Sequence, residues 1–176
     1  MDAVPAPSGE RFQDPAWRLW RFAQEILVRC PRCRGRAVVV VHPDHRDGHR
    51  YATSLLMSPH RLSCPSCGQT GDWSPRPAVR GDRHRYGALA VPRLSGPDDP
   101  FFGLPLWLQR PCCSGRVLWA YNVAHLELLQ SYVKARQRER GSWSGSGSLV
   151  ERLPAWIKAA RHRDEILAAI DALHAL

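Results

Sequence analysis

Apolar residues recur at helical spacing in the first part of the chain. Asp14 followed by Pro15 is typical of a helix start, and the segment that follows should end just before Cys30 and its proline. The apolar face of this segment contains Leu19, Trp20, Ala23, Ile26 and Leu27. The pattern therefore predicts a leading helix over residues 15–29, preceded by a loose, aperiodic tail at residues 1–13.

Short apolar and β-branched runs, separated by turn residues, fill the next part of the chain. The runs are Ala37–His42, Leu55–Met57, Arg61–Cys64, Gly71–Trp73 and Ala88–Val91. Two further apolar segments, Leu104–Gln109 and Arg116–Tyr121, flank a turn that contains Cys112 and Cys113. We expect the runs to form a small β unit and the two flanking segments to form a hairpin that extends its sheet.

Helical periodicity returns after Asn122, a typical N-cap residue, and predicts a second helix over about residues 123–139. Its apolar stripe contains Leu126, Leu129, Tyr132 and Val133. A Gly/Ser linker follows at residues 141–147. The segment Ser148–Glu151 has capping-box spacing, and Pro154 should end that short turn and lie in the first turn of a new helix. The stripe of a last helix contains Ile166, Leu167, Ile170 and Leu173.

The composition limits the broad class of protein. The chain has 176 residues, 44% of them hydrophobic, and its mean hydropathy is −0.37, which argues against both a membrane protein and a fully disordered chain. Residues 1–10 lack the pattern of a signal peptide. We therefore expect a cytoplasmic protein, in which the six cysteines are metal ligands or free thiols rather than disulfides.

Four of the cysteines form two Cys-x-x-Cys motifs. A turn with this spacing directs two thiolates to one metal ion, and backbone amides in the turn can donate hydrogen bonds to the sulfurs. Two such turns complete a closed tetrahedral site with no position open for water, which is typical of structural zinc. We therefore predict that zinc supplies much of the folding free energy of this small β unit. The predicted ligands are Cys30, Cys33, Cys64 and Cys67.

Together these patterns predict the α+β class, with a zinc-ribbon β unit, an extra hairpin, a leading helix and C-terminal helices. The expected organisation is a loose tail at residues 1–13, a helix with the ribbon and the long helix at 14–140, a linker at 141–147, and helices packing on the same unit at 148–176. The segment 42–60 between the two cysteine motifs is longer than a usual ribbon turn, so it forms an elongated hairpin or an inserted loop.

Other potential metal ligands lie outside the two motifs. The histidines of the inserted loop are His42, His45, His49 and His60. Their spacing matches no recurrent metal site, so a polar loop is favoured over a second site. Cys112 and Cys113 are adjacent, and buried free thiols are favoured over a metal site that one of them would share with His125. A disulfide between them is the weakest alternative, because adjacent cysteines bond only with strain.

The formal net charge is +9, and all the cations except Lys134 and Lys158 are arginine. Much of the excess lies in the β unit, where aromatic residues are interleaved with the arginines. Guanidinium groups bind phosphates and aromatic faces stack on bases, so this composition predicts a nucleic-acid-binding face. Its predicted residues are Arg32, Arg34, Arg36, Arg46, Arg50, Arg80, Arg83, Arg85, Tyr51 and Tyr86. A solvated basic face is the alternative, and arginine in place of lysine is also typical of a GC-rich genome.

Two further features bear on partners. A second basic group, at residues 134–140, ends the predicted second helix, where cations also complement the helix dipole without any ligand. Trp17 and Trp143 fall outside the predicted apolar faces. Exposed tryptophans often anchor protein partners, so both are candidates for partner binding, with folding back onto the ribbon as the alternative.

Several segments resemble a known group of proteins. They are Phe102–Gln109, Pro111–Cys113, Leu118–Asn122, Arg152–Lys158 and Arg163–Glu165. With the two cysteine motifs, they resemble small bacterial zinc-ribbon proteins of the transcription-factor-IIB type, over nearly the whole chain from Cys30 onward. The resemblance implies zinc held by Cys30, Cys33, Cys64 and Cys67. It implies no particular activity, because the group is largely uncharacterised and its name describes the shape of the ribbon.

The resulting functional hypothesis is a non-enzymatic accessory protein whose basic ribbon face contacts DNA or RNA, alone or within a larger complex. The alternative is a protein-interaction adaptor with a structural zinc and no nucleic-acid ligand. An enzyme is disfavoured, because the sequence contains no Gly-rich phosphate loop, nucleophile elbow or His-Glu-x-x-His motif.

Overall fold

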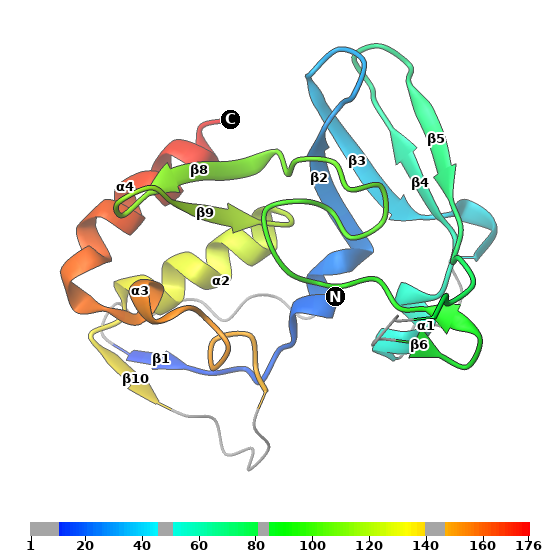
Figure 1. The fold of residues 1–176 in the computed structure, drawn as a ribbon. Coiled ribbons are helices and arrows are strands. Elements are labelled where there is room, and N and C mark those ends of the chain that lie inside the picture. The colour runs from blue at the N-terminus through cyan, green and yellow to red at the C-terminus, as the bar shows by residue number, and fades with distance from the viewer. Residues whose placement is uncertain (1–10, 46–50, 81–84, 140–146) are drawn as a thin grey trace. The chain divides into compact units, whose positions relative to one another are not determined.

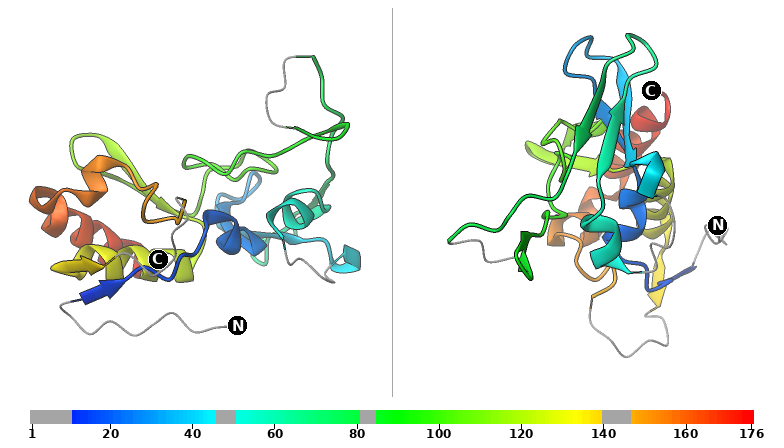
Figure 2. Two further views of the ribbon diagram at one scale, coloured as in Figure 1. Left: turned by 90° about the horizontal axis from the view of Figure 1, so that it is seen from below. Right: turned by 90° about the vertical axis from the view of Figure 1, so that its right-hand side faces the viewer.

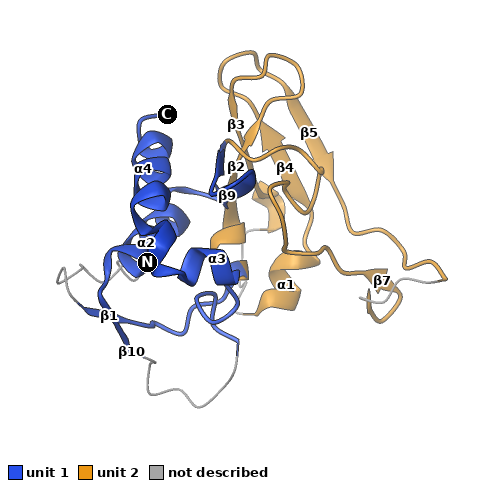
Figure 3. Cartoon of the chain, turned by 60° about the vertical axis from the view of Figure 1, so that its left-hand side comes forward, with its two compact units in different colours: residues 1–19, 108–176 blue, residues 20–107 orange. Residues whose placement is uncertain are grey.

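The computed structural model describes residues 11–45, 51–80, 85–139 and 147–176 (Figure 1). The chain is α+β, as predicted, and it divides into two compact units (Figure 3). Unit 1 is drawn from residues 1–19 and 108–176, and unit 2 is residues 20–107. None of the helices in the described ranges is long and apolar enough to cross a bilayer.

Unit 2 is built around a four-stranded antiparallel sheet. Its strands, in spatial and sequence order, are β2 (Glu25–Arg29), β3 (Arg36–Val41), β4 (His60–Ser63) and β5 (Thr70–Trp73). Figure 1 shows that the β2–β3 and β4–β5 loops lie together at one end of this sheet. These two loops carry the Cys-x-x-Cys motifs, so the strand pairing brings both motifs to the same place.

One face of the sheet forms the core of unit 2. Ile26 is paired with Val39, which is paired in turn with Leu62, and all three side chains are buried. Because side chains alternate between the faces of a strand, this register stacks the buried positions in one layer. His60 is also buried in this layer, and its ring stacks on Phe101 with centroids 3.5 Å apart.

The outer edge of β2 is covered by the segment 105–107 rather than left open. The amide of Arg29 donates to the carbonyl of Pro105 (2.8 Å), and the amide of Trp107 donates to the carbonyl of Leu27 (2.9 Å). The loop before this segment is held by Asp99, a buried residue whose carboxylate accepts backbone amides of the loop. The donors are Phe101 (3.0 Å), Phe102 (2.9 Å) and Leu104 (2.7 Å).

The rest of unit 2 consists of short elements. They are the 3-10 helices η1 (Leu19–Gln24, which begins at the end of unit 1) and η2 (Pro43–His45), helix α1 (Ala52–Leu56), and the hairpin of β6 (Arg85–Tyr86) and β7 (Leu89–Ala90). Figure 2 shows α1 and the β6–β7 hairpin at the end of unit 2 away from the two cysteine loops. Helix α1 and the β6–β7 hairpin therefore lie at the other end of the sheet from the cysteine motifs.

Unit 1 combines a hairpin with helices. Its elements are β1 (Arg11–Gln13), β8 (Leu108–Cys112), β9 (Arg116–Ala120), α2 (Val123–Lys134), β10 (Gln137–Glu139), α3 (Ala155–Lys158), η3 (Ala160–His162) and α4 (Arg163–His174). Helix α2 packs on α4 and on β9, and α4 also packs on β8. The core between them contains Leu126, Leu129, Ile166 and Ile170, all almost fully buried.

Unit 1 is discontinuous in sequence. Strand β1 pairs in parallel with β10, so that Arg11 lies beside Gln137 and Gln13 beside Glu139. The Nε atom of Arg11 also donates to the side-chain carbonyl of Gln137 across a separation of 126 residues (3.1 Å). Unit 2 is therefore an insertion in the sequence of unit 1.

Two predicted caps of unit 1, at Asn122 and at Ser148–Glu151, are confirmed, whereas no helix begins at Asp14. The side chain of Asn122 accepts the amide of His125 (2.9 Å) at the start of α2. The Ser148 amide donates to the Glu151 carboxylate (3.3 Å) and the Glu151 amide to the Ser148 hydroxyl (3.2 Å), the reciprocal pair of a capping box. The turn that they close is short, and α3 begins directly after Pro154, as expected.

The prediction of a leading helix is wrong over most of residues 15–29. Only Leu19–Gln24 is helical, as a 3-10 helix, and Glu25–Arg29 forms strand β2. Short apolar runs such as Ile26–Val28 suit either a helix or a strand. Pairing with β3 across the first cysteine loop decides between them, and it buries Ile26 and Val28 while their neighbours face outward.

Four other details of the prediction are corrected. Arg11–Gln13, expected in the loose tail, form a strand, and residues 1–10 lie outside the described residues. The run Leu55–Met57 belongs largely to helix α1 rather than to a strand. Helix α2 ends at Lys134, because residues 137–139 pair with β1. The β8–β9 hairpin is a separate two-stranded sheet and does not extend the sheet of unit 2.

The predicted division of the chain into domains stays a prediction, because it concerns independent folding as well as compactness. Of the linker predicted at residues 141–147, only Gly147 belongs to the described residues. Its amide donates to the carboxylate of Glu151 (2.6 Å), so this end of the predicted linker joins the capping box.

Candidate metal centre

Each Cys-x-x-Cys motif forms a tight turn directly after a strand, and the two turns repeat the same hydrogen bond. In the first, the amide of Arg34 donates to the carbonyl of Cys30 (3.0 Å). In the second, the amide of Gly68 donates to the carbonyl of Cys64 (3.0 Å). We call these turns the knuckles, and residues 29–36 with 63–70 the knuckle end of unit 2. The sheet register thus presents two equivalent pairs of thiols to each other.

The four sulfurs lie in a geometry that could bind a metal ion. Their Sγ atoms are all within 4.8 Å of one another. The Cys30–Cys67 and Cys33–Cys64 Sγ distances are 3.7 Å and 3.6 Å. A tetrahedral ion with metal–sulfur bonds of about 2.3 Å needs sulfurs about 3.8 Å apart, so the group already has the required size.

The electrostatics of the group depend on amides and on the neighbouring thiols. The amide of Cys33 favours the thiolate of Cys30 and, with that of Arg32, lowers its pKa to about 6. The amide of Gln69 also favours the thiolate of Cys67, but desolvation and the other three thiols raise that pKa to about 12. Four thiols this close cannot all ionise unless a cation balances their charge.

Apart from backbone hydrogen bonds, the knuckles are held by their cysteines rather than by an apolar core. Cys30 and Cys64 are buried, whereas Cys33 is exposed and Cys67 is half-buried. Apart from the cysteines and the two prolines, the sequences of both knuckles contain no apolar residue. Cohesion at this end therefore depends on what the four thiols bind.

The backbone of the first knuckle is strained at Arg34. Its φ is +66°, and Gly68 occupies the equivalent position of the second knuckle with φ +71°. Glycine takes this left-handed conformation freely, whereas a residue with a β-carbon loses about 1 kcal/mol or more there. The first knuckle thus carries an arginine where its counterpart carries the residue best suited to the turn.

The predicted nucleic-acid-binding residues fall into separate groups. Arg32, Arg34 and Arg36 are exposed at the knuckle end. Tyr51, directly before α1, and Tyr86, in β6, are 71% and 62% exposed. Helix α1 and the β6–β7 hairpin lie toward the opposite end of unit 2 (Figure 2). Arg80 and Arg85 are exposed in and beside the β6–β7 hairpin, and Arg46, Arg50 and Arg83 lie outside the described residues. Among the predicted residues that the structure describes, those at the knuckle end and those near α1 and the β6–β7 hairpin do not lie on one face.

Of the two predicted partner-binding tryptophans, one lies within the described residues. Trp17 is half-buried, and its backbone carbonyl accepts the amide of Leu149 (2.7 Å) within unit 1. Trp143 lies outside the described residues. In the second basic group, Arg138 is half-buried over the ring of Tyr132 and donates to the carbonyl of Lys158 (2.9 Å), so it serves the fold of unit 1.

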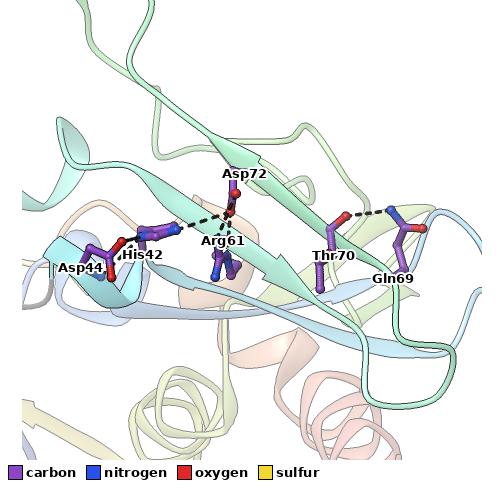
Figure 4. A network of polar contacts seen from close by, with 6 residues as sticks. All are labelled: His42, Asp44, Arg61, Gln69, Thr70 and Asp72. Carbon is purple, nitrogen blue, oxygen red and sulfur yellow. Dashed lines mark hydrogen bonds and ion pairs between the residues drawn. The ribbon is translucent and has the colours of Figure 1, made fainter.

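The histidines of the inserted loop belong to no potential metal group within the described ranges, and His49 lies outside them. His42 instead lies between two carboxylates, 3.5 Å from Asp44 and 3.8 Å from Asp72 (Figure 4). Arg61 donates two hydrogen bonds to Asp72, at 2.7 Å and 3.0 Å, and holds the pKa of that carboxyl below its usual value. This network supports the interpretation of a polar loop.

The vicinal cysteines are buried, as predicted, and the potential ligand beside them differs from the one in the alternative interpretation. Cys112 and Cys113 are grouped with Glu165 of α4 as potential metal ligands, without His125. The Nδ1 atom of His125 accepts the amide of Tyr121 (3.2 Å), and burial lowers the pKa of this histidine to about 3. Glu165 was missed because it is 52 residues from Cys113 and only the packing of α4 on β8 brings them together.

With the geometry established, the chain was compared with known proteins. It matches no family model, no curated protein and no solved structure. The resemblance to small bacterial zinc-ribbon proteins therefore stays a prediction, and function has to be inferred from the residues themselves.

Proposed function

We propose that this chain is a non-enzymatic, zinc-stabilised accessory protein whose knuckle end binds the phosphates of a nucleic acid. The observation that carries the proposal is the local charge. Arg32, Arg34 and Arg36 are exposed there, and the knuckle end contains no aspartate or glutamate. Within the described residues, none of these three guanidinium groups forms an ion pair.

The donor set supports zinc as the metal. Four cysteine thiolates in a tetrahedral arrangement are typical of structural zinc, and the Sγ distances of 3.6 Å and 3.7 Å suit its bond lengths. With four protein ligands, no coordination position remains for water or substrate. Such a centre stabilises the knuckles and leaves recognition to the surrounding side chains.

The charge balance supports an anionic ligand. A dication held by four thiolates leaves the centre with about two negative charges. Three guanidinium groups exceed that charge, so the knuckle end stays positive. Arginine forks match phosphate oxygens well, and each contact releases a counterion from the nucleic acid.

The strain at Arg34 supports the same proposal. Glycine would fit its left-handed backbone better, as Gly68 does in the other knuckle. Residues held in such conformations cluster at functional sites, where another interaction compensates for the lost stability. Phosphate binding by Arg34 is an interaction of that kind.

A salt-dependent binding titration tests the proposal. The zinc-loaded full chain is titrated into short fluorescein-labelled duplex DNA and single-stranded RNA, and anisotropy is measured at two ionic strengths. Three phosphate contacts to duplex DNA predict a roughly fortyfold loss of affinity from about 50 to 200 mM salt. Replacing all three arginines, Arg32→Ala, Arg34→Ala and Arg36→Ala, should abolish most of this salt dependence.

The matched control removes three arginines elsewhere in unit 2, through Arg76→Ala, Arg80→Ala and Arg85→Ala. The control changes the net charge equally, so it should retain most of the affinity if the knuckle end is the binding surface. Equal losses in both variants would contradict a local site. No binding of either nucleic acid at low salt would overturn the proposal and favour the adaptor alternative.

A further inference from the structure

The second cluster of thiols lies at the tip of the β8–β9 hairpin in unit 1. Cys112 ends β8, and Cys113 begins the three-residue turn to β9. Their Sγ atoms are 2.9 Å apart, and a carboxylate oxygen of Glu165 lies within 4.8 Å of both. Both cysteines are buried, at 6% and 1% exposure.

The backbone explains how adjacent residues place their thiols side by side. Successive side chains in a strand point to opposite faces, so two neighbouring cysteines would normally diverge. Here Cys113 has φ +50° and Ser114 has φ +64°, both in the left-handed region, which breaks the alternation directly after Cys112. Each non-glycine residue in this conformation costs about 1 kcal/mol or more, so the turn is held by other contacts.

Glu165 supplies one of those contacts. It lies in the first turn of α4, and its carboxylate accepts the backbone amide of Cys113. Glu165 is itself exposed, whereas the two sulfurs are buried beneath the hairpin. The cluster therefore combines two buried soft donors, the cysteine sulfurs, with one exposed hard donor, the Glu165 carboxylate. The turn that carries the cysteines is hydrogen-bonded to helix α4 through this carboxylate.

We propose that Cys112, Cys113 and Glu165 form a second metal site, which takes a thiophilic divalent cation of the zinc class. Two thiolates and a carboxylate are all ligands that zinc accepts, and two sulfurs exclude the hard ions magnesium and calcium. Binding releases the two thiol protons to water. Only these three donors meet at the site within the described part of the chain, so a water molecule completes the tetrahedron.

The proposed site differs from the knuckles in how far its sulfurs must move to bind an ion. Its Sγ atoms must separate from 2.9 Å to the roughly 3.8 Å of a tetrahedral zinc thiolate pair, whereas the knuckle sulfurs need almost no movement. It also offers three protein ligands instead of four. The second site should therefore bind its ion more weakly than the knuckles and lose it first.

Titration of the full, fully reduced chain with Co²⁺ tests this inference. Cobalt substitutes for zinc, and its thiolate charge-transfer absorption grows with the number of sulfur ligands. The wild-type chain should take up two Co²⁺, the first with strong absorption and the second, more weakly bound, with about half that intensity. The double variant Cys112→Ser with Cys113→Ser should take up only one.

A gentler variant guards against misfolding of the double substitution. Glu165→Gln keeps the shape and the acceptor for the Cys113 amide but removes the charged ligand, and it should weaken the second Co²⁺ at least about tenfold. Glu127→Gln, an exposed carboxylate of α2, should leave both equivalents unchanged. Uptake of a single Co²⁺ by the reduced wild type, or a second equivalent that survives the double variant, would overturn the proposal.

Discussion

The two thiol clusters of this chain contrast in how they are made. The knuckles draw four cysteines from two turns, each built by the Cys-x-x-Cys spacing, and their Sγ distances of 3.6 Å and 3.7 Å suit a tetrahedral ion. At the hairpin tip, the Sγ atoms of the adjacent cysteines are 2.9 Å apart. They lie this close because the backbone of Cys113 and Ser114 is left-handed. The Cys-x-x-Cys spacing and the pairing of the strands prepare the first cluster, whereas the second depends on two left-handed residues in one turn and on Glu165.

The surroundings of the two clusters differ as well. The knuckles contain no apolar residue beyond their cysteines and prolines, so a bound ion should contribute much of the cohesion there. The hairpin tip belongs to unit 1, whose core of Leu126, Leu129, Ile166 and Ile170 is buried independently of any thiol. Metal should therefore contribute more to the stability of unit 2 than to that of unit 1.

The largest expected effect is the loss of the knuckle metal. Structural zinc contributes on the order of 10 kcal/mol to the folding of small domains that depend on it. Chelation, or Cys30→Ser, should therefore expose the amides of β2–β5 to hydrogen exchange while those of α2 and α4 stay protected. Mass-spectrometric exchange of the full chain measures both. If the amides of β2–β5 stay protected after verified removal of the metal, unit 2 does not depend on metal more than unit 1 does.

The next effect concerns the core of unit 1. Leu129 is 1% exposed, so Leu129→Ala should lower the free energy of unfolding of unit 1 by about 3 kcal/mol through lost burial and a cavity. Urea unfolding followed by circular dichroism measures it, and the metal content should not change. Val123→Ala, on the same helix at 47% exposure, is the matched control and should cost less than about 0.5 kcal/mol.

Acid should weaken unit 1 through His125. Burial lowers the pKa of this histidine from 6.5 to about 3, so the folded chain takes up no proton there until strongly acid pH, whereas the unfolded chain does so below about 6.5. The stabilisation is complete above pH 6.5 and decreases as the pH falls toward 3, by about 2 kcal/mol at pH 5. His125→Asn should lose this slope.

The control for the acid effect is His174→Asn, which replaces an exposed histidine of α4. It should unfold with the same pH dependence as the wild-type chain, measured by urea unfolding at about pH 7 and about pH 5. An identical slope in the His125 and His174 variants would show that the buried imidazole is not responsible.

The smallest effect separates stability from binding at the first knuckle. Arg34→Gly relieves the left-handed strain and should raise the stability of zinc-loaded unit 2 by about 1 kcal/mol. Arg32→Gly removes the same charge at a position without a positive φ, and should instead lower stability by about 0.5–1 kcal/mol. Both should weaken DNA binding alike. If Arg34→Gly lowers the stability of unit 2, the claim that the left-handed backbone at Arg34 is strained is wrong.

Local signals in the sequence were sufficient where one short segment determines its own structure. The Cys-x-x-Cys spacing indicates the two turns, and Asn122 and the Ser148–Glu151 pair mark caps that the structure confirms. In each case the interacting groups lie within about one turn of the chain. Their geometry therefore depends little on the rest of the fold.

The signals failed where a distant segment decides the outcome. Residues 25–29 form a strand because β3 is available to pair with them, and residues 137–139 leave the helix because β1 is. The carboxylate beside Cys113 could not be chosen from the sequence either. Many acidic residues were available, and only the packing of α4 on β8 selects Glu165.

The parallel pairing of β1 with β10 has a consequence for how the chain is made. A ribosome adds roughly 5–20 residues per second, so β1 is synthesised on the order of ten seconds before its partner, 126 residues later. All of unit 2 is synthesised within that interval. All four cysteines of the proposed zinc site therefore leave the ribosome while the unit that encloses them in sequence still lacks a strand, a core and most of its helices.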